Sequence, residues 1–213
     1  WTFNWLNNTR LPSVSEAPQP VELLLQWHKQ DPPRKREVER NNYIQSVQKN
    51  RNPFSDHPEY VNYIDFNTLT KLNPVYAAEP TNHVTNLQTS SNGYSINLTW
   101  NQVAGTQAPS GYLIIAYDKD DYFLPIDGEV YTNDTNLGDG SAVVNTNSTT
   151  SYTFENLVNL EEYYFTVIPF NGEGTQINYK INGTLPRAIN IQAVPVELTS
   201  FSAVKTGSKV SLT

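Results

Sequence analysis

Basic side chains gather between residues 34 and 51, at a spacing that could hold the phosphate groups of a polyanion. Guanidinium and ammonium groups donate hydrogen bonds to phosphate oxygens without reading a base sequence. Glu37 and Glu39 alternate with these bases, so a solvated helix of balanced charge is the alternative interpretation. The six candidate contact residues are Arg34, Lys35, Arg36, Arg40, Lys49 and Arg51.

A helical wheel divides these candidates into two groups. Arg34, Lys35 and Lys49 share one side, which we expect to be the exposed side. Arg36 and Arg40 fall beside an apolar stripe, where they would stack on apolar side chains or pair with buried carboxylates. The stripe consists of Tyr43, Ile44 and Val47.

Other titratable residues are weaker candidates for chemistry. His28 lies within an apolar helical pattern and His57 precedes a proline, so we expect structural roles for both. Acidic residues crowd positions 118–139, and oxygen ligands alternate with glycine along Asp134–Gly140, as they do in calcium loops. The twelfth loop position is Asn145 where a calcium loop has a bidentate glutamate, which favours solvated loop acids.

The elements that must position these residues are helical between about Pro20 and Ile64. A first helix follows Pro20, a second runs from Pro32 to about Asn50, and a short third one follows His57. The apolar residues of the first helix, among them Trp27, spread over roughly 200° of the wheel, which predicts burial on most sides. The neighbouring helices are too short to cover it, so we expect further chain before Trp1 to complete this domain.

The apolar period changes from 3.6 to 2 after residue 80, which predicts an antiparallel sandwich. We assign structural roles to Trp100, at the end of the second strand, and to Tyr163, at the start of the fifth. The expected strands are Val84–Thr89, Tyr94–Trp100, Gly111–Asp118, Ser151–Phe154, Tyr163–Pro169 and Gln176–Asn182.

Composition limits the classes of function. The chain has 213 residues, no cysteine and a net charge of −7, so disulfides, thiolate metal sites and cysteine nucleophiles are excluded. Residues 1–78 carry nine basic against eight acidic side chains, whereas the remainder carries five against thirteen. Only the first part is therefore suited to a polyanion. No apolar run is long enough for a transmembrane segment.

Four blocks between residues 24 and 59 resemble the C-terminal part of bacterial endonuclease I enzymes, which have the ββα-metal (His-Me finger) fold. The resemblance covers about forty residues, and the blocks have the family's order and spacing. The blocks are Leu24–Pro32, Glu39–Ile44, Gln48–Phe54 and Asp56–Glu59.

The resemblance implies a histidine that activates water and a divalent cation, Mg²⁺, that stabilises the departing oxygen of DNA or RNA. The family's catalytic and metal-binding residues precede these blocks, so we expect them upstream of Trp1 and expect residues 1–213 alone to be inactive. Arg40 and Arg51 lie within the blocks, which favours structural roles for both. A nuclease-like domain without activity, in a surface adhesin or polysaccharide-binding protein, is the alternative.

Trp100 and the Leu157–Tyr163 segment resemble the core aromatic residue and the tyrosine corner of fibronectin type III modules. Val194–Phe201, together with Val210–Leu212, resembles the start of a β-module of proteins exported by the type IX secretion system. These likenesses imply a secreted or cell-surface protein of a Gram-negative bacterium. The β-modules would contact surface polysaccharide or the secretion machinery.

We therefore expect a multidomain chain with an α part followed by an all-β part. Residues 1–65 would be the C-terminal helical part of an endonuclease I-like domain, and residues 66–79, which lack periodicity, a linker. Residues 80–193 would form an antiparallel fibronectin type III-like sandwich. Residues 194–213 would begin a further β-module.

Overall fold

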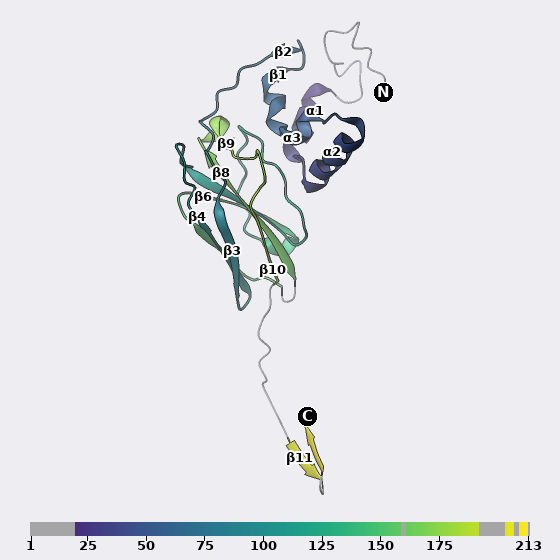
Figure 1. Ribbon diagram of the computed structural model, residues 1–213, viewed down its shortest axis with the longest axis vertical. Coiled ribbons are helices and arrows are strands. Elements are labelled where there is room, and N and C mark those ends of the chain that lie inside the picture. Colours follow the sequence, from purple (N-terminus) through teal and green to yellow (C-terminus); the bar gives the residue numbers. More distant parts are fainter. Residues whose placement is uncertain (1–19, 159–160, 192–202, 207–208, 213) are drawn as a thin grey trace.

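The computed structural model describes residues 20–158, 161–191, 203–206 and 209–212. Figure 1 shows a helical segment at one end of a β-sandwich and a separate hairpin at the other end. The predicted β-module at Val194–Phe201 lies outside the described residues.

The helical segment begins with the two longer helices that the sequence predicted. The third predicted helix is a 3-10 helix, preceded by a short α-helical turn that Asn52 caps by accepting a hydrogen bond from the main-chain N–H of Phe54 at 3.1 Å. The linker region contributes a short hairpin. These elements are α1 (Val21–Gln30), α2 (Lys35–Gln48), α3 (Pro53–Asp56), η1 (Pro58–Tyr63), β1 (Ile64–Asp65) and β2 (Thr70–Lys71).

The described residues bury α1 on one side only, and its predicted burial on most sides, which involved chain before Trp1, stays a prediction. Val21 is the buried residue of this helix, whereas Leu24 and Trp27 remain about half exposed. Val21, Leu24 and Leu25 line a shallow cavity of about 200 Å³ together with Phe54 and Val61. The described residues thus cover one side of the helix, because the two elements beneath it are only one or two turns long.

Two antiparallel sheets form the sandwich. One has the strand order β10-β8-β5-β6, with β9 paired to β8, and the other has the order β3-β4-β7. The strands are β3 (Thr85–Asn92), β4 (Ser95–Asn101), β5 (Gly111–Tyr117), β6 (Ser141–Thr146), β7 (Ser151–Phe154), β8 (Glu162–Asn171), β9 (Asn178–Tyr179) and β10 (Arg187–Ile191). A two-stranded sheet, β11 (Ala203–Thr206) with β12 (Lys209–Leu212), follows.

Five of the six predicted strands appear with small shifts of their ends. The sixth, Gln176–Asn182, shrinks to the two residues of β9, because a 3-10 turn (η3, Gly174–Gln176) occupies its start. The sequence prediction also missed β6 and β10. Both strands are short edge elements, and β10 directly follows Pro186, which weakened the strand signal.

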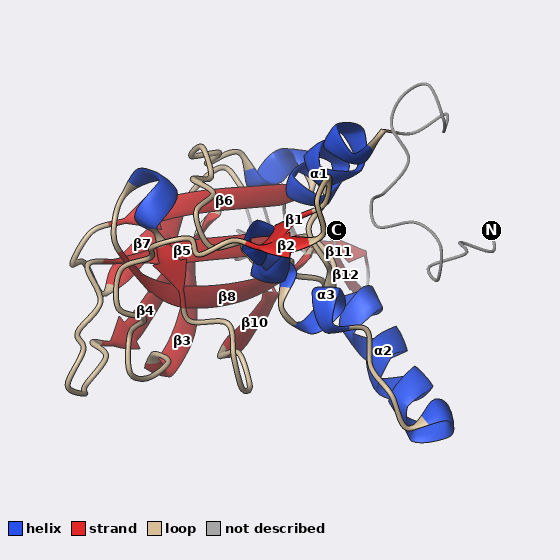
Figure 2. Ribbon diagram, turned by 90° about the horizontal axis from the view of Figure 1, so that it is seen from above, coloured by secondary structure: helices blue, strands red, loops and turns tan. Residues whose placement is uncertain are grey.

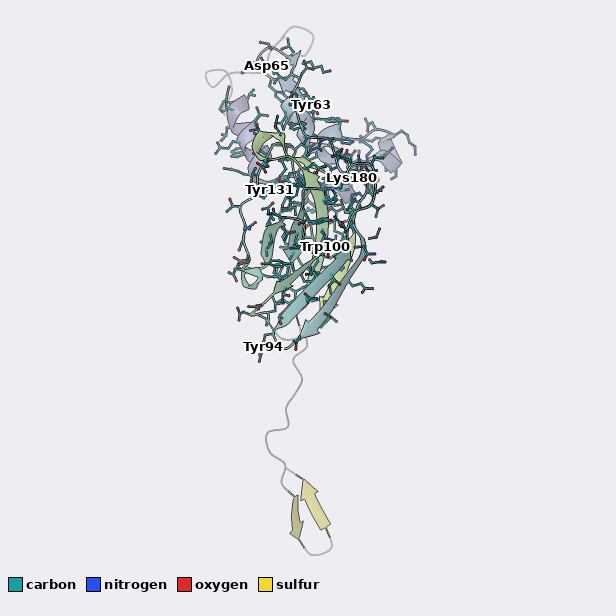
Figure 3. All side chains as sticks on the ribbon, turned by 90° about the vertical axis from the view of Figure 1, so that its left-hand side faces the viewer. Tyr63, Asp65, Tyr94, Trp100, Tyr131 and Lys180 are labelled. Carbon is teal, nitrogen blue, oxygen red and sulfur yellow. The ribbon has the colours of Figure 1, made fainter. Side chains whose placement is uncertain are left out.

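The two structural aromatic residues lie in the core between the sheets. Trp100 is 3% exposed, lies among the strands of the sandwich (Figure 3), and meets Tyr112 edge to face at 5.5 Å. The hydroxyl of Tyr163, which is 2% exposed, accepts a hydrogen bond from the main-chain N–H of Val158 at 3.1 Å. This bond is the predicted tyrosine corner, and it fixes the turn that enters β8.

Strand β5 is buried on both faces, which is unusual for a sandwich with one solvated side. Its even-numbered residues, such as Ile114, point into the inner core with Trp100. Its odd-numbered residues, Leu113, Ile115 and Tyr117, belong to a second cluster on the outer face of the sheet. Residues 119–140, which contain no strand, supply Phe123 and Leu124 to this outer cluster.

Candidate nucleic-acid interface

The N-terminal end of α2 is joined to the sandwich through main-chain hydrogen bonds. Arg34 forms an isolated antiparallel bridge with Phe123 of the 119–140 segment. The N–H of Lys35 donates to the carbonyl of Tyr122, and the N–H of Leu124 donates to the carbonyl of Pro33, each at 2.9 Å. The side chains of Arg34 and Lys35, two of the candidate phosphate contacts, are therefore held against the β part of the chain.

Arg34 and Lys35 use their charges at this junction. The Nη1 of Arg34 lies 3.4 Å from Asp121 and donates to the hydroxyl of Tyr117 at 3.3 Å. The Nζ of Lys35 lies 3.0 Å from Asp120 and also pairs with a glutamate of α2. The expectation that these two cations are exposed is not met, since both pair with the acidic loop of the sandwich and are only partly exposed.

Arg51 has the structural role that its place in a family block implied. Its guanidinium forms two hydrogen bonds with the carboxylate of Asp56, and its Nη1 donates to Asn42 and Gln45 of α2 at 2.8 and 2.7 Å. The hydrogen bonds from Arg51 lower the pKa of Asp56, so the carboxylate stays ionised. Arg51 therefore ties α2 to α3.

The exposed face of α2 carries Arg36, Arg40 and part of the apolar stripe, although the sequence predicted that this face would be packed against other parts of the chain. Arg36 and Arg40 are exposed and form no salt bridge with any described residue, and Tyr43 and Val47 are 70% and 63% exposed. Their spacing of four, three and four residues places these four side chains on one side of the helix. Figure 2 shows α2 projecting away from the strands. Lys49 ends the helix, exposed, with its Nζ on the carbonyl of Ser46.

Each histidine has a structural partner. The rings of His28 and His83 bond main-chain carbonyls at 2.8 and 2.7 Å. His57 places Nδ1 3.1 Å from Glu59 and stacks on Tyr60 at 4.6 Å. Within the part of the chain that the structure describes, no group of three or more histidine, aspartate or glutamate side chains could hold a metal ion.

The sequence analysis missed a buried carboxylate where the helical segment meets the sandwich. Asp127 is 7% exposed; its Oδ1 accepts the N–H of Tyr179 at 2.7 Å, and its main-chain carbonyl accepts a hydrogen bond from Asn62. Burial, together with the nearby charges of Glu59 and Glu79, raises the pKa of Asp127 to about 7. The position had been counted among solvated loop acids, because the sequence carries no signal of its burial.

Comparison with known proteins agrees with this two-part organisation. The Endonuclease I family model matches residues 9–59, and the fibronectin type III domain model matches residues 80–182. Residues 80–182 are a fibronectin type III-like β-sandwich. The Endonuclease I match takes in most of the helical residues before them.

Two curated relatives match a short stretch of the chain. The extracellular ribonuclease of Bacillus subtilis (strain 168) is 54% identical over 43 residues, which is 20% of this chain and 15% of that protein. The extracellular ribonuclease of Bacillus amyloliquefaciens is 49% identical over 45 residues, which is 21% of this chain and 16% of that protein. The chain thus spans about one sixth of the length of these relatives.

Solved structures similar to the chain include fibronectin type III domains. The chicken CNTN1 FN1–FN3 domains match with a TM-score of 0.38 and 19% identity, covering 54% of this chain and 33% of that one. The fn3 domain of the human collagen alpha-1(XX) chain matches with a TM-score of 0.36 and 12% identity, covering 61% and 97%. Among the described residues, no helix has the length and apolar character needed to cross a membrane.

Proposed function

We propose that this chain is part of a secreted nuclease that hydrolyses the phosphodiester bonds of DNA or RNA with little sequence preference. The observation that carries the proposal is the match of residues 9–59 to endonuclease I, together with short matches of the chain to two extracellular ribonucleases at about half identity. The names of these relatives favour RNA as one substrate and an extracellular location. The type IX-like pattern near the C-terminus favours export from a Gram-negative cell.

A divalent cation, Mg²⁺, would stabilise the departing oxygen in the parent protein, as in the family that the segment resembles. The described residues offer no fitting set of ligands, because their histidines and most buried acids are already engaged in structural contacts. We therefore assign no catalytic residue to this chain, and we expect residues 1–213 alone to cleave neither DNA nor RNA.

The contribution of this chain to nucleic-acid binding comes from the exposed face of α2. Arg36 and Arg40 lack carboxylate partners among the described residues, so their guanidinium groups are available to phosphate oxygens. Tyr43 lies on the same face, where its ring offers a surface for an unpaired base. These contacts depend on the backbone and on stacking, which accounts for the low sequence preference that we propose.

Cleavage assays with the longer parent protein test this function. Supercoiled plasmid and a structureless RNA are incubated with the protein and Mg²⁺, then with EDTA, and then with Mg²⁺ in excess. We expect cleavage that EDTA abolishes and that added Mg²⁺ restores. Absence of cleavage of both substrates with Mg²⁺, Mn²⁺ and Ca²⁺ would refute the proposal and favour an inactive nuclease-like domain in an adhesin.

A further inference from the structure

A cavity of about 450 Å³ lies between α2 and the β9–β10 connection, so its walls come from both the nuclease-related segment and the sandwich. This volume is within the range of pockets that bind small ligands, roughly 300 to 1,000 Å³, and such pockets form preferentially between domains. Its apolar part continues the outer cluster of the sheet and consists of Val38, Tyr122, Leu124, Ile181 and Leu185.

Both guanidinium groups in the wall already have carboxylate partners. Arg51 is held by Asp56, and the Nη2 of Arg187 donates to Asp120 at 2.7 Å. Arg187 also lies 4.8 Å above the ring of Tyr122. The Nη1 of Arg187 is buried without a hydrogen-bond partner, but the charge of each guanidinium is already matched by a carboxylate. A phosphate group entering the cavity would therefore find no cation without a carboxylate partner.

The wall does offer neutral polar groups with unused hydrogen-bonding capacity. In the described part of the chain, the hydroxyl of Thr184, the Nδ2 of Asn42 and the Nε2 of His57 have no hydrogen-bond partner. The carboxylate of Asp56 keeps further lone pairs beside its bonds to Arg51. Donors and acceptors around an apolar floor match the hydroxyl rim and the C–H face of a sugar ring.

We propose that this cavity binds an uncharged sugar unit of a polysaccharide, held between the nuclease-related segment and the sandwich. The neutral donors and acceptors take the hydroxyl groups, and Leu124, Ile181 and Tyr122 take the apolar face of the ring. The proposal is independent of nuclease activity. It gives a position to the polysaccharide contact that the acidic β part suggested from the sequence.

Calorimetric titration of the full chain tests the proposal with maltohexaose, cellohexaose, xylohexaose and chitohexaose as neutral probes. 5′-AMP and inorganic phosphate serve as anionic probes. We expect at least one of the four oligosaccharides to bind, and neither anion to bind at the same concentration. The titration involves no cleavage, so its result and that of the nuclease assay can fail separately.

Two variants of Thr184 locate the site. Thr184 is exposed at the rim, so Thr184→Trp fills the cavity without burying the indole in the core, and we expect at least about a tenfold loss of sugar affinity. Thr184→Val removes one hydroxyl, and the loss of a single hydrogen bond predicts a decrease of about threefold to tenfold. Thr149→Trp, at an exposed threonine outside the cavity, is the matched control and should bind as the parent does.

Three results would overturn the proposal. The first is that none of the four oligosaccharides binds the parent chain. The second is that a sugar binds equally well to the parent and to both Thr184 variants, which would place the site elsewhere. The third is that 5′-AMP or phosphate alone binds and Thr184→Trp blocks it, which would make the cavity a nucleotide or phosphate site. If the tryptophan variant melts at a lower temperature than the control, the valine variant decides.

Discussion

Replacing Asp127 by asparagine should remove a pH dependence of stability that the buried carboxylate introduces. In the folded chain the pKa of Asp127 is raised from 3.8 to about 7. Between these two pH values the folded state keeps the proton and the unfolded state releases it. The free energy of unfolding therefore falls as pH rises from about 4 to about 7, and the full penalty remains above that pH.

The size of this penalty follows from the shift. A change of roughly three pKa units corresponds to roughly 4 kcal/mol, at about 1.4 kcal/mol per unit. Asparagine carries no charge and can still accept the hydrogen bond from the N–H of Tyr179 through Oδ1. Its amide N–H₂ is buried without an assigned partner, at a cost of about 1 to 3 kcal/mol. We expect the variant to be about 1 to 3 kcal/mol more stable than the parent at pH 8, and less stable at pH 4.

Urea denaturation at pH 4, 6 and 8 measures this difference for the parent, Asp127→Asn and the exposed control Asp139→Asn. The stability curves of the parent and Asp127→Asn should cross between pH 4 and pH 8, and the control should keep the slope of the parent. An Asp127→Asn variant that is less stable than the parent at pH 8, or that keeps the same slope, would refute the argument. Either result would mean that burial does not raise the pKa of Asp127 in the folded chain.

Three further predictions follow from the junction and the core. Charge reversal in the double variant Arg36→Glu/Arg40→Glu should weaken RNA binding by the parent protein regardless of the RNA sequence. Measured by fluorescence anisotropy, the slope of the logarithm of the binding constant against the logarithm of the salt concentration should fall by about 2. An unchanged slope would exclude both residues from the interface. Tyr163→Phe should lower the free energy of unfolding by about 1 kcal/mol in chemical denaturation, because the N–H of Val158 loses its acceptor, and a neutral result would show that water replaces the hydroxyl. Asp120→Asn should accelerate amide hydrogen exchange at the start of α2, since it removes one carboxylate shared by two cations, whereas unchanged exchange would show that the main-chain bonds suffice.

The sandwich was predictable because its signals are local. Alternating apolar residues define β4, and continuous apolar runs define β5 and β8. The tyrosine corner requires only a tyrosine five residues beyond the N–H from which it accepts a hydrogen bond. The outer cluster was not predictable in the same way. Its members come from β5, from the 119–140 segment and from Val38 of α2, and no periodicity links residues so far apart in the chain.

The two faces of α2 were reversed for a related reason. The helical wheel grouped the side chains correctly, since Arg36 and Arg40 do share a face with Tyr43. It could not say which face meets a partner, because that depends on the acidic loop at Asp120 and Asp121, more than eighty residues away. The basic residues at the start of α2 face this acidic loop, and Tyr43 therefore remains exposed on the other side of the helix.

The linker does not act as a flexible spacer. The main-chain N–H of Ala77 donates to the carbonyl of Gln176, and the carbonyls of Ala77 and Ala78 accept hydrogen bonds from Asn178 and Asn171. Residues that the sequence predicted as a connection without periodicity therefore run along the sandwich as an additional fixed segment. Together with the bridge from Arg34 to Phe123, they hold α2 at one orientation to the sheet.

This fixed orientation separates the two proposed binding surfaces. At 100° per residue, Val38 and Asn42 lie on the side of α2 that faces the cavity, and Arg36 and Arg40 lie about 160° away from them. A sugar in the cavity and a nucleic acid on the outer face would therefore not compete for the same side chains. Bound polysaccharide would instead hold the nuclease-related segment with its basic face turned outward, so anchoring and contact with substrate would be compatible in one chain.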